Sequence, residues 1–315
     1  MGNHFTPATL QKVAKAARQK NLAHRPIDMH RYFVERKALI DAALSQYLEP
    51  RDTLISPRLH EAICYSVLDA GKRFRPILTL SIGELFGAAR APLLSFACAI
   101  ELIHCYSLIH DDLPALDNDD FRRGKASCHK RFGEAIALLA GDALLTEAFF
   151  IASDAALARG LGSSLSAQLG REISQAAGMR GMISGQSKEI ELGHSEVTPA
   201  VLEELDGLKT GALITTAARV GALIGRATRK DLDRITHYAR CLGLAFQITD
   251  DMLDEHETIT DEHKRLTNYL SVAGKSKAVE RVQSLFAQCL KDVEPYGKAA
   301  EPLREIARYV VERKQ

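Results

Sequence analysis

The sequence predicts an all-α fold. Apolar residues recur with helical period along nearly all of the 315 residues, Leu and Ala are abundant, and alternating Val, Ile or Thr runs typical of strands are absent. The length and an apolar content of 46% allow a large buried core in one domain or two. Because no linker, repeat or change of composition interrupts the pattern, we expect a single-domain bundle of ten or more helices.

The helices are assigned from the apolar period, with ends defined to about 2–4 residues. They are expected at residues 30–48, 57–70, 76–87, 92–112, 133–158, 165–187, 199–224, 228–256, 272–292 and 299–313. Prolines support five of the starts, because a first helical turn does not need their missing amide hydrogens. These are Pro57, Pro76, Pro92, Pro199 and Pro302.

Composition narrows the classes of function. Lys and Arg total 41 against 40 for Asp and Glu, so charge gives no general reason to expect nucleic acid or an anionic membrane as partner. The six cysteines form no Cys-x-x-Cys pair, which indicates neither a zinc knuckle nor a redox motif. No uninterrupted apolar run approaches the roughly 20 residues that span a bilayer, so we expect no integral membrane segment.

The N-terminal region differs from the rest of the chain. Residues 1–27 contain five Lys or Arg and no Asp or Glu, a composition shared by organelle transit peptides and by surface helices. We expect an N-terminal extension at residues 1–28, the main domain at residues 29–315, and a cytoplasmic location, with organelle targeting as the alternative.

Two acid-rich segments carry the first functional hypothesis. Residues 111–117 and 250–254 each end an apolar helical stretch, about 140 residues apart. Carboxylate oxygens suit Mg²⁺, which usually joins one or two carboxylates to substrate phosphates. Acids that merely solvate helix ends are the alternative, but acid pairs at a helix C-terminus oppose the helix dipole. Phosphate chemistry is therefore the leading interpretation.

The spacing in the first segment defines a helix face. His104, Ser107 and Asp111 follow i, i+3 and i+7, which places them on one side of the predicted helix. Pro114 disfavours continued helix, so Asp117 must reach the same ion from a loop.

The second segment repeats the pattern, and basic clusters accompany both. Gln247, Asp250 and Asp254 again follow i, i+3 and i+7, so two facing stripes could hold a small group of Mg²⁺ ions. The basic clusters are residues 71–76 (GKRFRP), 122–124 (RRG) and 209–211 (KTG). Arginine suits diphosphate because its planar fork binds two oxygens, although any one cluster could be a solvated charged face.

From about residue 30 onward the chain resembles the trans-isoprenyl diphosphate synthases, the polyprenyl synthetase family. The matching motifs are residues 71–76, 101–124, 141–144 (GDAL), 185–186 (GQ), 209–213 (KTGAL) and 246–254. Several motifs in family order are harder to obtain by chance than a lone glycine pattern. The resemblance implies the isoprenoid synthase type of fold, with helices around a central active-site cavity.

The resemblance also implies roles for individual residues. Three Mg²⁺ ions with an allylic diphosphate would be bound, directly or through water, by Asp111, Asp112, Asp117, Asp250, Asp251 and Asp254. Arg122 would contact that diphosphate, and the pocket for isopentenyl diphosphate would be formed by Lys72, Arg75, His104 and Arg123. The residues near the allylic carbon would be Lys209, Thr210 and Gln247. In the implied reaction, diphosphate leaves the allylic substrate and its allylic carbon becomes cationic. The double bond of isopentenyl diphosphate attacks that carbon, and a proton is then lost.

Product length should depend on Tyr106. It precedes Asp111 by five residues, hence lies roughly 7.5 Å deeper at 1.5 Å per residue. An aromatic ring at that depth, together with two extra residues in the 111–117 segment, resembles bacterial-type farnesyl diphosphate synthases of the family. A geranylgeranyl diphosphate synthase, in which Tyr106 would be an ordinary core residue, is the alternative.

Departures from the family pattern keep other functions open. Residues 255–268 are shorter and more acidic than the usual loop, Ala70 replaces a usual glycine, and Glu189 stands where aspartate is common. A weakly active regulatory subunit of a heteromeric synthase is therefore an alternative. A terpene cyclase is disfavoured, since it needs no second diphosphate pocket. The resemblance implies isoprenoid diphosphates as the small-molecule partners and a homodimer as the assembly.

Overall fold

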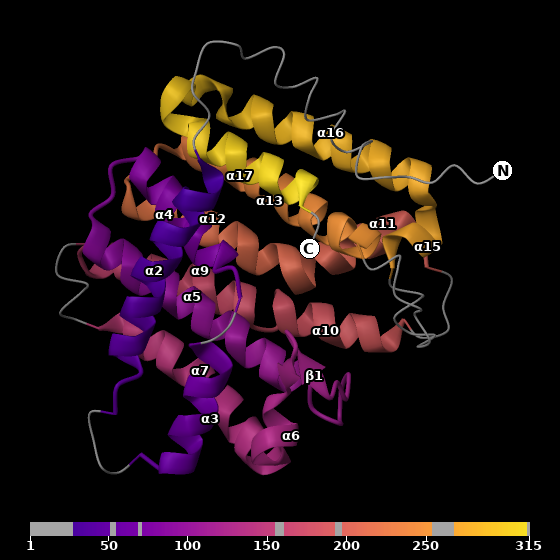
Figure 1. The fold of residues 1–315 in the computed structure, drawn as a ribbon. Coiled ribbons are helices and arrows are strands. Elements are labelled where there is room, and N and C mark those ends of the chain that lie inside the picture. The colour runs from indigo at the N-terminus through magenta and orange to yellow at the C-terminus, as the bar shows by residue number, and fades with distance from the viewer. Residues whose placement is uncertain are drawn as a thin grey trace. The chain divides into compact units, whose positions relative to one another are not determined.

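A computed structural model describes residues 28–50, 55–68, 71–154, 161–192, 197–253 and 268–313. Within these ranges helices predominate, and the strands are limited to β1 (Phe121–Arg122) and β2 (Lys125–Ala126), which pair antiparallel (Figure 1). The predicted all-α class is confirmed. Residues 1–27 of the predicted extension and residues 255–267 of the loop after Asp254 lie outside the described residues.

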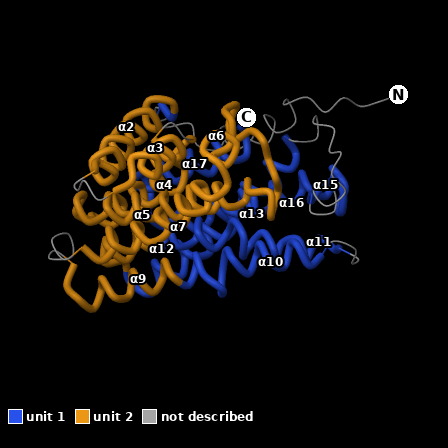
Figure 2. Tube along the Cα trace, turned by 90° about the horizontal axis from the view of Figure 1, so that it is seen from below, with its two compact units in different colours: residues 1–29, 175–219, 228–315 blue, residues 30–174, 220–227 orange. Residues whose placement is uncertain are grey.

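The chain forms two compact units, shown in different colours in Figure 2. Residues 30–174 and 220–227 make up one, called here the Asp111 unit. Residues 1–29, 175–219 and 228–315 make up the other, called the Asp250 unit. Each acid-rich segment thus belongs to a different unit.

The Asp111 unit is built around one apolar helix. Its helices are α2 (Met29–Tyr47), α3 (Pro57–Val67), α4 (Phe74–Leu85), α5 (Arg90–Asp111), α6 (Cys128–Phe132), α7 (Glu134–Ser153) and most of α9 (Ser163–Ala177). Helix α5 packs against α4 and α7, and its Phe96, Ile100 and Ile103 are almost fully buried. Burial of such side chains stabilises by roughly 1.5–3 kcal/mol each. The same helix ends at Asp111.

The Asp250 unit is organised around the long helix α13 (Arg229–Leu253), which packs against two C-terminal helices. Its other elements are α10 (Met182–Glu191), α11 (Pro199–Asp206), the π-helix η1 (Gly207–Gly211), α12 (Ala212–Ile224, shared with the Asp111 unit), α15 (Tyr269–Ala273), α16 (Lys275–Val293), the 3₁₀-helix η3 (Glu294–Ala300) and α17 (Glu301–Glu312). Buried Tyr238 of α13 donates a hydrogen bond to the Leu303 carbonyl oxygen at 2.8 Å, which ties α13 to α17.

The predicted helices match the structure with three kinds of difference. All five prolines lie in the first turns of α3, α4, α5, α11 and α17. The predicted helix at 165–187 is two helices, separated at residues 178–181, and the one at 272–292 is preceded by the separate short helix α15. The hairpin β1–β2 and the short helix α6 carry no apolar period long enough to have been predicted.

Within the described ranges, two helices are long and apolar enough to cross a membrane by length and composition, namely α5 and α7. In α5, 78% of the most apolar window is buried inside the protein, so its hydropathy reflects its place in the core. In α7 the buried share is 39%, and Leu138, Leu139 and Phe150 are exposed. Helix α7 therefore presents an apolar face at the surface of its unit.

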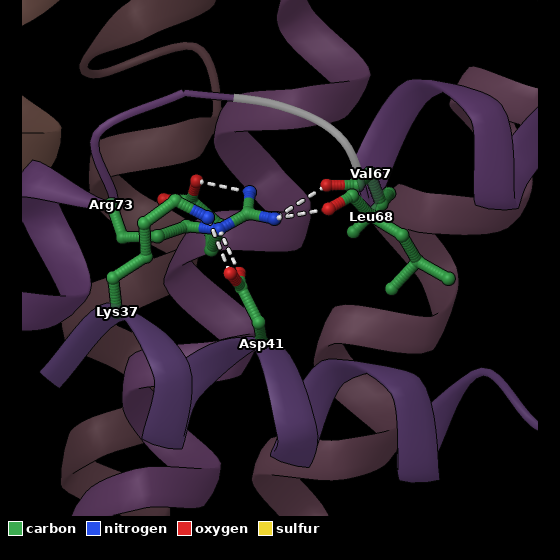
Figure 3. A network of polar contacts seen from close by, with 6 residues as sticks. Lys37, Asp41, Val67, Leu68 and Arg73 are labelled. Atoms are coloured by element: carbon green, nitrogen blue, oxygen red, sulfur yellow. Dashed lines mark hydrogen bonds and ion pairs between the residues drawn. The ribbon is translucent and has the colours of Figure 1, made fainter. Parts of the chain in front are cut away.

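A buried arginine joins four helices of the Asp111 unit (Figure 3). The side chain of Arg73 is fully buried, and its Nε donates to Asp41 Oδ1 at 2.7 Å. Its Nη1 donates to Glu101 Oε1 at 2.9 Å, and its Nη2 to the Val67 carbonyl oxygen at 2.6 Å. Burial alone lowers the pKa of Arg73, but Glu101 and Asp41 outweigh burial and raise it. The guanidinium thus links α2, α3 and α5 to the start of α4.

Arg73 adopts a conformation that is unfavourable for an L-residue. Its φ of 53° is left-handed, which costs roughly 1–3 kcal/mol for a residue other than glycine. The hydrogen bonds to Asp41, Glu101 and Val67 hold it there. This kink separates Lys72 from Arg75, so the backbone of the basic cluster 71–76 is set by a residue that faces the interior.

We expect Arg73→Met to lower the free energy of unfolding by about 3–5 kcal/mol, because it leaves buried Glu101 without a cation. Urea denaturation of both variants measures this. The control is Arg31→Met on α2, where Arg31 pairs with Glu35 on an exposed surface and the loss should stay below about 1 kcal/mol. Equal small losses in the two variants would show that the buried network contributes little.

Candidate active site

The end of α5 places two carboxylates near water. Asp111 is the last residue of α5, and the backbone N–H of Asp117 donates to the Asp111 carbonyl oxygen at 2.9 Å. The turn that begins near Pro114 therefore folds Asp117 back toward the helix end. Asp117 lies in a turn, as Pro114 predicted, and its side chain is exposed, whereas that of Asp111 is partly buried.

Asp112 points to a different environment from its neighbour. It is only 2% exposed, and its Oδ1 accepts from Arg122 Nε at 2.8 Å and also from Arg122 Nη2. Arg122 Nη2 also donates to Asp119 Oδ2 at 3.2 Å. Burial raises the pKa of Asp112, although the hydrogen bond from Arg122 acts in the opposite direction. Asp112 thus anchors the hairpin strand β1 to the end of α5.

The predicted cations of the Asp111 unit gather around His104. Burial and then the charges of Arg75 and Arg123 lower the pKa of His104 well below its ordinary value, so its imidazole is neutral at pH 7. Gly71 explains how residues 71–76 and the hairpin approach each other. A Cβ at Gly71 would lie 2.6 Å from Arg123 Nη1, and its φ of +76° also favours glycine. Lys72, next in the chain, is exposed. The structure therefore assembles a cationic site from two distant motifs.

Tyr106 lies deeper along α5. Its side chain is 5% exposed, and its ring meets that of His110 edge to face with centroids 5.7 Å apart. Among the described residues its hydroxyl has no hydrogen-bond partner. Burial, followed by the charge of Asp111, raises the pKa of Tyr106 to about 12. The Tyr106 side chain is therefore packed, and its hydroxyl is un-ionised at neutral pH.

In the Asp250 unit, the first acid of the pair, Asp250, is more exposed than the second, Asp251. The side chain of Asp250 is 38% exposed, and its Oδ1 lies 2.7 Å from Arg313 Nη2. Asp251 is buried, and both its carboxylate oxygens accept hydrogen bonds, from the Tyr269 N–H at 2.7 Å and from Gln247 Nε2 at 3.1 Å. Asp254, the third predicted ligand, lies outside the described residues.

The π-helix η1 carries two of the three predicted catalytic residues. Thr210 Oγ1 donates to Gln247 Oε1 at 3.2 Å, and Gln247 in turn reaches Asp251. Lys209 Nζ pairs with Glu189 Oε2. A Cβ at Gly185 would lie 2.7 Å from Lys209 Cα, so only glycine lets α10 approach η1 this closely. Wide π-turns are frequent at functional sites. Thr210 and Gln247 thus lie in one hydrogen-bonded chain with Asp251, and Lys209 precedes Thr210 on the same π-helix.

Sequence reasoning missed two residues of this neighbourhood. Asp206 is buried at the end of α11, and burial, followed by Asp251 and Glu189, raises its pKa to about 8. Its position three residues before Lys209 is the only signal that could have drawn attention to it. Arg313 stacks on the Phe246 ring, 3.7 Å from the centroid, in addition to pairing with Asp250. Nothing in its local sequence marks it.

Each unit by itself offers carboxylate oxygens of the kind that hard divalent cations prefer. Asp111 and Asp117 are the more accessible acids in the Asp111 unit, and Asp250 is the more accessible acid in the Asp250 unit, where it also pairs with Arg313. Mg²⁺ keeps several waters and takes few carboxylates beside substrate phosphates, so either set of oxygens suits it.

Comparison with known proteins agrees with this chemistry. The family model described as polyprenyl synthetase matches residues 56–271. The chain belongs to the polyprenyl synthetase family. It is 43% identical over 229 residues to a farnesyl diphosphate synthase of Geobacillus stearothermophilus, covering 72% of this chain and 76% of that protein. It is 34% identical over 316 residues to geranylgeranyl pyrophosphate synthase 7, chloroplastic, of Arabidopsis thaliana, covering 94% and 87%.

A solved structure extends the likeness to three dimensions. The crystal structure of an FPP/GFPP synthase from Zymomonas mobilis superposes with a TM-score of 0.82 at 37% identity, covering 90% of this chain and 99% of that one. Sequence and fold together make the chain a trans-prenyltransferase of the polyprenyl synthetase family.

We expect Asp111→Ala and Asp250→Ala each to lower turnover at least about 100-fold, because each removes an oxygen donor for the cation that would neutralise the departing diphosphate. The melting temperature should change little in Asp111→Ala, whereas Asp250→Ala should also lower it, because it leaves the buried Arg313 without this carboxylate. The matched control is Asp233→Ala, an exposed acid on the same helix as Asp250, which should retain activity. If all three variants retained activity and showed equal shifts in melting temperature, neither Asp111 nor Asp250 would belong to the active site.

Proposed function

We propose that the chain condenses isopentenyl diphosphate head to tail with dimethylallyl and then geranyl diphosphate, giving farnesyl diphosphate and releasing diphosphate. The observation that most supports this proposal is the cationic site around His104, which is separate from the acid-rich segments. A condensation needs such a second diphosphate pocket. The names of the relatives, which include both farnesyl and geranylgeranyl synthases, support the substrate class.

Mg²⁺ is the proposed metal, with Asp111, Asp117 and Asp250 as the accessible donors and Asp254 as a further one. When bound, it neutralises the charge of a departing diphosphate. Asp112 and Asp251 act as positioning residues in this proposal. Each is held by protein donors and fixes the backbone at the end of a helix, which in turn aims the neighbouring acid.

Basic side chains hold the two diphosphates. Lys72, Arg75 and Arg123 bind that of isopentenyl diphosphate, where planar arginine forks match phosphate oxygens. His104, neutral in this environment, carries one N–H that can donate a hydrogen bond to the diphosphate. For the allylic diphosphate, the proposed partners are Arg122 and Lys209.

Lys209, Thr210 and Gln247 face the developing carbocation in this proposal. Thr210 donates its hydroxyl hydrogen to Gln247, which leaves its oxygen lone pairs available to a positive carbon. Oriented dipoles in a site without water stabilise such a cation. No protein base is assigned, and the released diphosphate takes the final proton.

The proposal extends to assembly and location. The exposed apolar residues Leu138, Leu139 and Phe150 on α7 form the kind of surface that partner subunits cover, which favours a homodimer. A cytoplasmic location is proposed as well.

Turnover by the purified chain tests the proposal. With Mg²⁺, isopentenyl diphosphate and dimethylallyl diphosphate, it should release diphosphate and form a fifteen-carbon product, and omission of isopentenyl diphosphate should abolish release. Turnover without isopentenyl diphosphate would instead indicate a cyclase. Negligible turnover of the folded chain by itself would favour the regulatory-subunit alternative raised by residues 255–268.

Tyr106→Ala should shift the product from fifteen toward twenty carbons or more, because it removes a buried ring about 7.5 Å below Asp111. Chromatography of the dephosphorylated products measures this. Tyr106→Phe is the control, since it removes only the hydroxyl and keeps the ring, and its products should match those of the unmodified protein. An unchanged distribution in Tyr106→Ala would refute the assignment.

A further inference from the structure

A second group of metal-ligand side chains lies on α13 and α16 of the Asp250 unit. One ligand atom each from His237, Cys241 and Asp292 falls within 4.8 Å of the other two. His237 Nδ1 is 2.6 Å from Asp292 Oδ2, and its Nε2 is 3.9 Å from Cys241 Sγ. Among the described residues this is the only such group of His, Cys, Asp or Glu. None of the three has a role in the proposed condensation.

The two helices hold these side chains in place. His237 and Cys241 are four residues apart on α13, so they share one helix face. Asp292 lies near the end of α16, which packs along α13 (Figure 1). Cys241 is buried and Asp292 nearly so, whereas the side chain of His237 is 55% exposed. An ion from solvent could therefore reach the group past the imidazole.

The three donors suit a thiophilic cation. Thiolate, imidazole and carboxylate are the protein ligands of Zn²⁺, at about 2.0–2.3 Å in tetrahedral geometry, which places sulfur and nitrogen roughly 3.6 Å apart. The observed 3.9 Å separation needs only a small side-chain movement. Gln288 Oε1 lies 3.3 Å from Cys241 Sγ and adds a polar oxygen beside the sulfur. A soft sulfur ligand disfavours Mg²⁺ here.

We propose that His237, Cys241 and Asp292 form a binding site for Zn²⁺ or a similarly thiophilic divalent cation, separate from the carboxylates assigned to Mg²⁺. Three protein donors leave a fourth position for water.

The metal must displace a proton from the thiol. Burial, and then the charge of Asp292, raise the pKa of Cys241 to about 11, so the metal-free thiol is protonated at neutral pH. Coordination to Zn²⁺ favours loss of the thiol proton, because a thiol bound to the ion is deprotonated. Without a cation, the cluster is simply a His237–Asp292 pair beside a buried thiol, and the experiment must separate these two states.

Co²⁺ is the probe, added to the full-length protein in excess Mg²⁺ so that the aspartate sites are occupied. We expect a thiolate-to-cobalt charge-transfer band that Zn²⁺ abolishes by competition. Cys241→Ser should remove the band. The matched control is Cys64→Ser on α3, where Cys64 lies 3.4 Å from His60 at the same i, i+4 spacing but belongs to no such three-residue group among the described residues. It should leave the band intact.

Affinity measurements complete the test. Asp292→Asn should weaken Co²⁺ binding about 10- to 100-fold. His237→Ala should do the same and, because its side chain is half-exposed, serves if Cys241→Ser does not fold. No band in the unmodified protein, or an unchanged band in the folded His237→Ala or Cys241→Ser variant, would overturn the proposal. None of these readouts depends on prenyl transfer, so the result stands whether or not that assignment holds.

Discussion

The burial of one positive charge organises the Asp111 unit. Arg73 has no water to solvate it, so its guanidinium must be satisfied by Asp41, Glu101 and a carbonyl oxygen at the end of α3. An unsatisfied buried charge would cost several kcal/mol. The demand for these partners fixes the start of α4, and through it the backbone on both sides. The interior residue Arg73 therefore sets the backbone that carries the outward-facing basic residues of the cluster 71–76.

The same arrangement recurs in both acid pairs. Asp112 and Asp251 are buried and bonded to protein donors, while Asp111 and Asp250 are more exposed, Asp250 also pairing with Arg313. Adjacent helix residues point about 100° apart, so one carboxylate of each pair can be fixed in the interior while the next stays available. A doubled acid at a helix end thus need not mean two ligands. It can mean one ligand and one anchor.

Local sequence patterns account for much of this protein. Helical period and five first-turn prolines predicted the helices, and the resemblance assigned Thr210 and Gln247, which are hydrogen-bonded in the structure, to one predicted site. The separation of α9 from α10, the hairpin and the burial of Asp206 depend on tertiary packing, which overrides period. Arg313 and the His237–Cys241–Asp292 group were hidden for a related reason. The residues in contact lie up to 67 positions apart in the chain, and cysteine spacing alone could not reveal a site completed by another helix.

The contact between Gly71 and the Arg123 side chain has a consequence for natural variation. Residue 71 has no side-chain atom to offer a substrate, yet any larger residue there would push the guanidinium aside. A ranking of natural variants by their direct contact with ligand would score such a replacement as harmless. Its phenotype would nevertheless imitate the loss of the arginine itself, with weakened capture of an anion in a molecule that still folds.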